Sequence, residues 1–315
     1  MTILHKYILF QSLIVTAFAI GFLLRKRHAN PERLSSRLVM ANLVLIEPPI
    51  ALWSIWGLAL GADLIVLPAA GVALVLAGFA FGVPLARLLG LSGRRRATFL
   101  ISASLANHGF TMGGIVCYLL MGERGLGLSF IFVSYFSFYL YAVVFPYAEF
   151  HTGASRPLGE RLRELVFNAR NMPLYAACAG MALSAAGIAR PAAAVPIDAL
   201  LMASVAAYYL ALGLNFALDD VRVSMGAHVA LGALKFALVP LCAIVPLAFL
   251  EVDPAVKSVV IVQSFAPAAV YSVVTAVVFR LDARLASGMF VVNTLVYLGA
   301  VLPAIFLFGR ALLPR

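Results

Sequence analysis

Residues 64–89 read LIVLPAAGVALVLAGFAFGVPLARLL, with Arg87 as the only charged side chain in the run. An α-helix needs about 20 mainly apolar residues to cross the hydrocarbon core of a bilayer, so this run is long enough. Similar runs recur along the whole chain, separated by short polar connections. They are continuous apolar stretches, whereas the strands of a membrane barrel alternate over about ten residues. The sequence therefore predicts an all-α membrane protein.

Composition supports the same class. Of the 315 residues, 63% are hydrophobic and 11% are charged, with a mean hydropathy of +1.03, whereas soluble domains carry about 25% charged residues. The net charge is +10, but the basic residues sit between apolar runs, so we interpret them as topology determinants and expect a lipid bilayer, not nucleic acid, as the partner. The three cysteines each stand alone in an apolar run, and we expect no metal and no cofactor.

Ten apolar segments can be drawn along the chain, which we treat as one transmembrane domain, residues 1–315. Basic residues cluster after the first, third and fifth segments, in Arg25–Arg37, Arg94–Arg96 and Arg156–Arg170. Basic connections stay on the cytoplasmic side, so both termini are predicted to be periplasmic, in the inner (plasma) membrane. The segments are 7–24, 37–60, 64–89, 98–121, 126–149, 172–189, 195–218, 226–249, 255–279 and 285–309.

Five segments precede the basic loop 151–171 and five follow it, so the halves 1–150 and 172–315 have opposite orientations. Each half crosses the membrane an odd number of times, which is the layout of an inverted repeat. The fourth segment is interrupted by Asn107-His108-Gly109, and the ninth by Pro267 after Gln263-Ser264. Irregular backbone at membrane depth is tolerated where it is buried in protein or lines a cavity. We therefore predict that segments four and nine are broken, cross each other and form a binding site. The alternative is that Gly and Pro are simply common in membrane helices.

Two ionisable side chains lie deep in the predicted membrane segments. Lys235 lies about 13 Å into the eighth segment, and Glu47 lies at a similar depth in the second. The charges can form a structural pair, or Lys235 can be the counter-charge of an anionic substrate; the sequence leaves both open. Asp219 and Asp220, at the end of the seventh segment, are interpreted as a solvated loop.

Polar side chains near the two interruptions are further candidates. Asn107, Gln263 and Ser264 can offer amide and hydroxyl groups to a substrate, although each can equally satisfy freed backbone. His108 can be linked to protons, because imidazole titrates near neutral pH, or can be a packing histidine. The candidates for substrate binding are Asn107, His108, Gly109, Gln263, Ser264, Pro267 and Lys235.

The segments NHGF (107–110) and MGERGL (121–126) resemble the first-half signature of the auxin efflux carrier family. APAAV (266–270), RLD (280–282) and AS (286–287) resemble its second-half signature. The chain departs from the family at Gly114, where a proline is frequent, and at Tyr271, where an asparagine is frequent. The resemblance implies the fold of bile-acid symporters and sodium/proton antiporters, and an elevator-type carrier in which one group of helices moves with the substrate.

The expected function is secondary transport of a small organic anion, most simply a carboxylate. Sodium-coupled proteins resembling this one place an acidic residue near the position of Gln263, so proton coupling or uniport is preferred over sodium coupling. HExxH, GxSxG and CxxC are absent from the sequence, so an enzyme is not expected. The alternative function is a cation/proton antiporter of the same fold. Substrate identity and the formation of a homodimer are left open.

Overall fold

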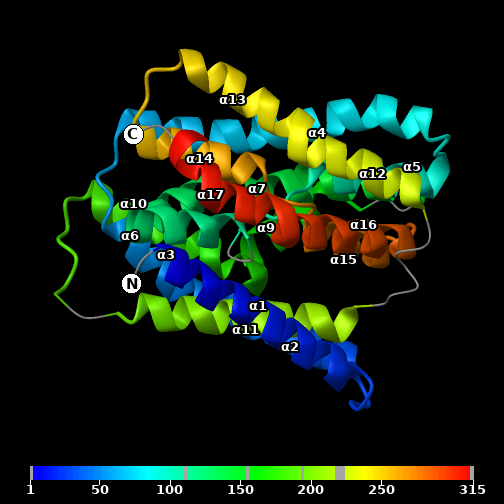
Figure 1. Cartoon of the computed structure of the whole chain (residues 1–315), viewed down its shortest axis with the longest axis horizontal. Helices are drawn as coiled ribbons and strands as arrows, with labels where there is room; N and C mark the ends of the chain where they lie inside the picture. Colours follow the sequence, from blue (N-terminus) through cyan, green and yellow to red (C-terminus); the bar gives the residue numbers. More distant parts are fainter. Residues whose placement is uncertain (1–2, 110–111, 154–155, 193–194, 217–223, 313–315) are drawn as a thin grey trace. The chain divides into compact units, whose positions relative to one another are not determined.

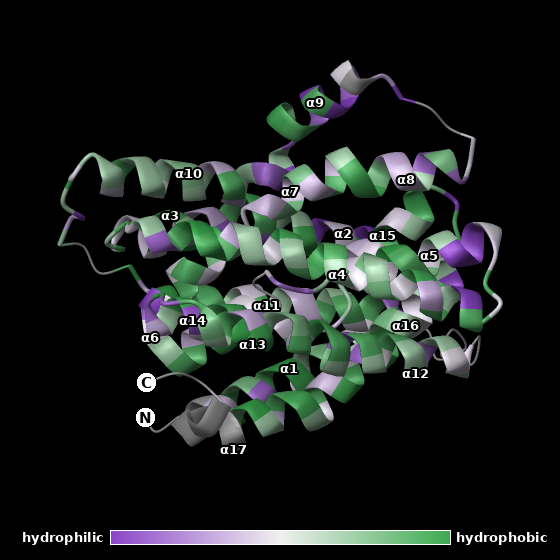
Figure 2. Ribbon diagram, turned by 90° about the horizontal axis from the view of Figure 1, so that it is seen from above, coloured by the Kyte–Doolittle hydropathy of each residue, from purple (hydrophilic) through white to green (hydrophobic). Residues whose placement is uncertain are grey.

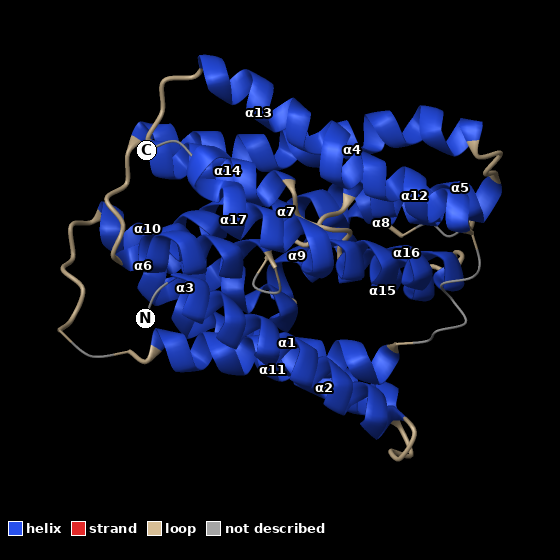
Figure 3. Ribbon diagram, in the orientation of Figure 1, coloured by secondary structure: helices blue, strands red, loops and turns tan. Residues whose placement is uncertain are grey.

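The structure, a computed structural model, describes residues 3–109, 112–153, 156–192, 195–216 and 224–312. Within these ranges it is helical, without β-strands (Figure 3). Hydrophobic residues cover most of the helices, and hydrophilic residues gather at helix ends and connections (Figure 2). Asp219 and Asp220 lie outside the described residues.

In the described part of the chain, seven helices are long and apolar enough to cross a membrane. The chain is thus a multi-pass membrane protein, and the predicted all-α class is confirmed. The seven are Tyr7–Arg25, Pro31–Trp56, Ala62–Leu88, Gly113–Phe150, Ile197–Asn215, Met225–Phe249 and Ala283–Leu307.

Three of the ten predicted segments differ from these seven for identifiable reasons. Segment 172–189 contains α10 (Met172–Ala185), whose 14 residues are fewer than the about 20 of a typical span. Segments 98–121 and 255–279 are not continuous helices: the first is interrupted between α5 and α6, and the second between α14 and α15. Both predicted interruptions are therefore present.

The chain divides into two compact units that are interleaved along the sequence. The first unit comprises Met1–Leu64, Gly109–Ser134 and Phe167–Phe216, and the second comprises Ile65–His108, Tyr135–Val166 and Ala217–Arg315. The helices of the first unit are α1 (Ile3–Arg25), α2 (Pro31–Ala41), η1 (Asn42–Ile46), α3 (Glu47–Trp56), η2 (Ala62–Ile65) at its edge, α6 (Gly113–Val133), η4 (Ala169–Asn171), α10 (Met172–Ala185) and α11 (Ile197–Asn215).

The second unit holds the remaining helices. They are α4 (Val66–Leu88), α5 (Gly93–Ser104), α7 (Tyr135–Tyr139), η3 (Leu140–Val144), α8 (Phe145–Phe150), α9 (Leu158–Phe167), α12 (Met225–Ala233), η6 (Leu234–Leu238), α13 (Val239–Phe249), α14 (Pro254–Ser264), α15 (Val270–Val278), α16 (Ala283–Val296), η7 (Tyr297–Val301) and α17 (Leu302–Leu312).

Glycines let helices of the first unit pack backbone to backbone. Helices α1 and α11 lie side by side and run in the same direction (Figure 1). A methyl group added at Gly213 would collide with the Phe18 carbonyl of α1, and one added at Gly21 would collide with the Leu210 carbonyl of α11. Helices α3 and α10 pair in the same way, with Gly180 against the backbone of α3. Small residues at such contacts allow the close approach on which membrane helices depend.

Helix α6 turns back on itself at Gly122. This residue has φ 65° and ψ −152°, a combination that is essentially restricted to glycine. A methyl group added at Gly125 would meet the Cys117 carbonyl, and one at Gly114 would lie 3.1 Å from Ser129 Oγ. Residues 113–121 and 123–133 are therefore antiparallel. The predicted connection between segments four and five is a reversal of the chain at a single glycine.

Four π-helical turns each precede a proline by two residues. A proline has no N–H, and its ring crowds the carbonyl four residues earlier, which in each case is the central residue of the π turn. Widening the helix to i→i+5 bonding relieves this crowding. The pairs are η1 with Pro48, η3 with Pro146, η6 with Pro240 and η7 with Pro303.

Candidate functional site

The two interruptions lie side by side within the second unit, joined by their backbones. The Asn107 N–H donates to the Pro267 carbonyl at 2.8 Å, and the Ala269 N–H donates to the Leu105 carbonyl at 3.2 Å. Ala106 and Ala268 thereby form an antiparallel bridge. Backbone groups released from the helices thus satisfy one another in a buried position. The elements that end or begin here are α5, α14 and α15.

Asn293 of α16 supports this bridge from the side. Its Oδ1 accepts the Ala268 N–H at 3.2 Å, and its side chain is buried. Asn293 was not among the predicted site residues. A lone asparagine within the apolar run 285–309 was the signal that could have identified it, because a buried amide in a membrane helix requires a partner.

His108 is buried and held on both ring nitrogens. Its Nδ1 lies 2.7 Å from the Tyr135 hydroxyl, and the ring also forms a hydrogen bond with the backbone of Gln263. The Gln263 carbonyl can only accept, so the other ring nitrogen is the donor and Nδ1 accepts from Tyr135 in a neutral imidazole. If His108 takes up a proton, Nδ1 becomes a donor and the Tyr135 hydroxyl must rotate. The two residues would then act as one proton-responsive pair.

Lys235 lies at the carboxyl end of the half-helix α5. Its Nζ donates to the carbonyl of Ser104, the last residue of α5, at 3.3 Å, and its side chain is buried. A cation is favourable at a helix C-terminus, where the last carbonyls lack helical partners. The Ser104 hydroxyl donates to the Val75 carbonyl at 3.1 Å and lies 2.6 Å from the Tyr139 hydroxyl. Lys235 therefore compensates the end of an interrupted helix.

Gln263 carries the largest unused hydrogen-bonding capacity near the bridge. Its side chain is fully buried, and neither Oε1 nor Nε2 has a partner within the described residues. Such a group costs about 1–3 kcal/mol when left unpaired. The neighbouring Ser264 differs, because its hydroxyl donates to the Ile261 carbonyl of its own helix at 2.7 Å. Ser264 thus has a local structural role, whereas the side-chain amide of Gln263 can still form hydrogen bonds with a ligand.

The structure brings together Asn107, His108, Gln263, Pro267 and Lys235 in the second unit. Gly109 belongs to the first unit, where its carbonyl accepts the Gly114 N–H at 3.1 Å. Glu47 also lies in the first unit and accepts a hydrogen bond from Tyr208. Glu47 and Lys235 thus each have a partner within their own unit.

The described residues contain no group of three or more His, Cys, Asp or Glu side chains that could hold a metal ion. No known protein family model matches the sequence. A comparison with curated proteins also finds no matching relative.

Proposed function

We propose that this chain is a secondary transporter of the auxin efflux carrier type that carries a small organic anion across the inner membrane. The observation that carries the proposal is the backbone bridge between the two interruptions, next to the unpartnered amide of Gln263. Interrupted helices that meet within a membrane protein are typical of substrate sites in secondary transporters. The amide of Gln263 would then complete its hydrogen bonds with the substrate.

The charge balance at the bridge favours an anion. The polar side chains described there are neutral or basic: Asn107, His108, Gln263 and Lys235. The first amides of the half-helix α15 add partial positive charge. A carboxylate fits this set, because amide N–H groups and a helix N-terminus are donors that favour oxyanions.

Two compact units support an elevator mechanism. The second unit contains the whole bridge together with α4, α5 and α12–α17, so it can carry the site intact. We expect it to move relative to the first unit, which contains α1–α3, α10 and α11. The family resemblance implies that segments three to five and eight to ten move against segments one, two, six and seven. Helix α6, which belongs to segments four and five, departs from this division because it clusters with the first unit.

We further propose ten crossings in two inverted repeats of five. In such a repeat, segment one corresponds to segment six and segment two to segment seven. Helix α1 (segment one) packs on α11 (segment seven), and the corresponding pair is α10 (segment six) on α3 (segment two). Both pairs are parallel and both have a glycine against a backbone carbonyl, which supports this relation. Segments five and ten also each contain a π turn, η3 and η7.

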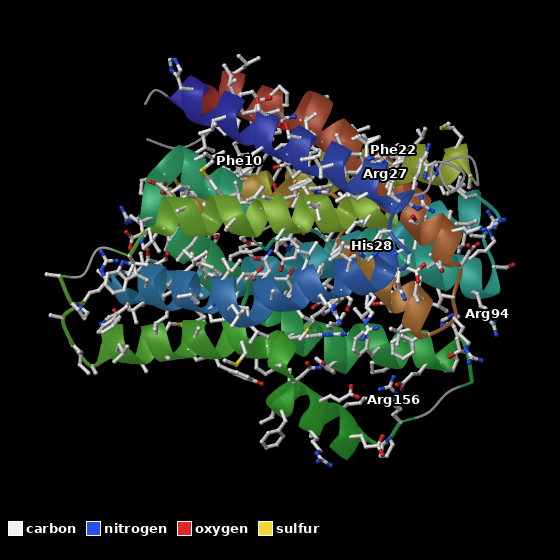
Figure 4. All side chains as sticks on the ribbon, turned by 90° about the horizontal axis from the view of Figure 1, so that it is seen from below. Phe10, Phe22, Arg27, His28, Arg94 and Arg156 are labelled. Atoms are coloured by element: carbon white, nitrogen blue, oxygen red, sulfur yellow. The ribbon has the colours of Figure 1, made fainter. Side chains whose placement is uncertain are left out.

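The basic connections 94–96 and 156–170 meet at one end of the second unit, as expected if both are cytoplasmic. Arg95 Nε lies 3.6 Å from Asp282 Oδ2, and the Arg156 guanidinium stacks over Phe279 with its Cζ 5.4 Å from the ring centroid. Figure 4 shows Arg94 and Arg156 toward the same side. The residues Phe279–Asp282 follow α15 and contact both basic connections, so both connections lie at the end of the second unit where α15 ends.

Cysteine labelling should therefore place residue 163 in the cytoplasm. In a variant without the three native cysteines, Arg163→Cys should react with a membrane-impermeant maleimide only after cells are opened. Ala189→Cys, in a connection predicted to be periplasmic, should react in intact cells. Reaction of Arg163→Cys in intact cells would contradict both the topology and the inverted repeat.

Transport should persist when sodium is replaced by choline. The described residues between Asp253 and Asp282 include no acidic side chain, and a hard cation needs carboxylate or several carbonyl ligands. Uptake of radiolabelled acid by proteoliposomes in sodium or choline buffer at equal pH measures this. A loss of uptake in choline would show that sodium is required.

The function itself can be tested by a thermal-shift screen of the purified protein. Acetate, succinate and indole-3-acetate represent mono-, di- and aromatic carboxylates, and each would be tested at two pH values. Binding to the native state raises the unfolding midpoint, by an amount that grows with ligand concentration. A midpoint that no acid raises, but that a cationic substrate such as choline does raise, would count against an anion carrier.

A further inference from the structure

Glu47 is a buried carboxyl group without a positive partner in the described part of the first unit. Its side chain is buried at 4% exposure, and Tyr208 donates a hydrogen bond to it. The ion pairs of the described residues do not include it. An isolated carboxylate in such surroundings is so unfavourable that a protein normally neutralises it.

The charged groups on the helices packed against Glu47 are directed elsewhere. On α2 and η4 they are exposed to solvent: Glu32, Arg33, Arg37 and Arg170. On α6, Glu123 pairs with Arg190 and Arg124 is exposed, while on α11 Asp198 accepts from Tyr118. The other titratable side chains nearby are also placed: Tyr209 donates to Met112 Sδ at 2.9 Å, and Tyr175 of α10 is exposed.

Two buried polar atoms on η1 and α11, the helices next to this carboxyl group, lack a hydrogen-bond partner among the residues that the structure describes. Asn42 donates its Nδ2 to the Ser204 carbonyl at 2.8 Å, but its Oδ1 has no partner within the described residues, and neither has Ser204 Oγ. Ser204 and Tyr208 are one turn apart, so they lie on the same face of α11. Asn42 and Glu47 are one π turn apart, so they also share a face of their helix.

The prolines after Glu47 add another acceptor. Positions 48 and 49 are both proline and have no N–H, so the Val44 carbonyl lacks a helical donor at i+4 and at i+5. A proton on the carboxyl group would supply a donor for Asn42 Oδ1 or for the Val44 carbonyl.

We propose that Glu47 is a proton-binding site of the first unit. The neutral acid accepts from Tyr208 through one oxygen and donates through the other to Asn42 Oδ1 or to the Val44 carbonyl. Ionisation leaves a buried negative charge with one neutral donor, the Tyr208 hydroxyl. Release of the proton is therefore linked to the separation of α3 from α11, which would expose the carboxylate. The site is separate from the bridge, and its existence does not depend on the transport proposal.

Infrared spectroscopy tests this directly, because the carbonyl stretch of a protonated carboxyl group is separate from the carboxylate bands. The purified protein at pH 7 should show this band, Glu47→Gln should lose it, and Tyr208→Phe should shift it. The control is Glu149→Gln. Glu149 is equally buried but binds Arg161 and lies 3.3 Å from Arg156, so its removal should leave the band unchanged.

The pH dependence of stability provides a second measurement. A folded state that holds one proton more than the unfolded state loses stability as pH rises. Between pH 6 and 9 the unfolding midpoint of the parent should therefore fall more than that of Glu47→Gln.

Three results would overturn the assignment. The first is a band that survives in Glu47→Gln. The second is a band that is absent from the parent and appears in Lys235→Gln, because Glu47 would then be ionised in the parent and balanced by that lysine. The third is a midpoint that sodium chloride raises relative to choline chloride in the parent but not in Glu47→Gln, because the ligand would then be a metal cation.

Discussion

Replacing Gly213 with alanine should destabilise the protein strongly, by about 1–3 kcal/mol or more. The new methyl group would collide with the Phe18 carbonyl and would lie 2.7 Å from the Phe22 amide nitrogen. Both are backbone atoms, so relief requires α1 and α11 to separate along a contact that both helices share. The unfolding midpoint of the purified protein, measured by intrinsic fluorescence or a thiol-reactive dye, reports the loss.

The matched control is Gly232→Ala in α12. A methyl group there would meet nothing closer than Asn293 Nδ2, at 3.9 Å. An alanine in a helix interior is about 0.5–1 kcal/mol better than a glycine, so this variant should be neutral or more stable. Equal midpoints for the two variants would show that close packing of α1 on α11 contributes little to stability.

Replacing Gln263 with leucine should weaken acid binding by about tenfold or more while making the protein more stable. The two amide atoms without partners among the described residues cost about 1–3 kcal/mol, and an apolar leucine side chain removes that cost. The same amide is proposed to bind the substrate, and a lost hydrogen bond to a charged group weakens binding by about tenfold or more. The midpoint without ligand should rise, and the ligand-induced shift should nearly vanish at an acid concentration close to the Kd of the parent.

Thr294→Val is the control for this prediction. Thr294 Oγ1 is also buried and unpartnered within the described residues, so valine should again raise the midpoint. Its ligand-induced shift should remain, because Thr294 is not proposed to contact substrate. A Gln263→Leu variant that keeps the shift would remove Gln263 from the site. A loss of stability in this variant would show that the amide is already satisfied.

The interruptions were predictable because their chemistry is local. Asn107-His108-Gly109 and Pro267 each disfavour helical bonding through their own backbone and side chains, and the structure has non-helical backbone at both places. The reversal at Gly122 was likewise close to the predicted connection, since glycine alone tolerates its dihedral angles. The four π turns were missed, although the proline after each was a usable signal.

The partners of the buried polar groups could not be predicted, because they come from residues far away in the sequence. Lys235 contacts the Ser104 carbonyl, and that backbone group is exposed as an acceptor only where α5 ends. Glu47 accepts a hydrogen bond from Tyr208, which lies 161 positions away in the sequence. Depth along a segment says how deep a charge lies, but not which neighbouring helix lies beside it.

The pairing of α1 with α11 has a consequence for biosynthesis. Arg25 at the end of α1 bonds the Phe216 carbonyl at the end of α11, and the two residues are 191 positions apart. The ribosome releases the first helix long before its partner exists, so the glycine face of α1 must wait in lipid or against the insertion machinery. Assembly of the first unit therefore cannot be completed before α11 has been synthesised, and chains truncated before residue 197 should be substrates for membrane quality-control proteases.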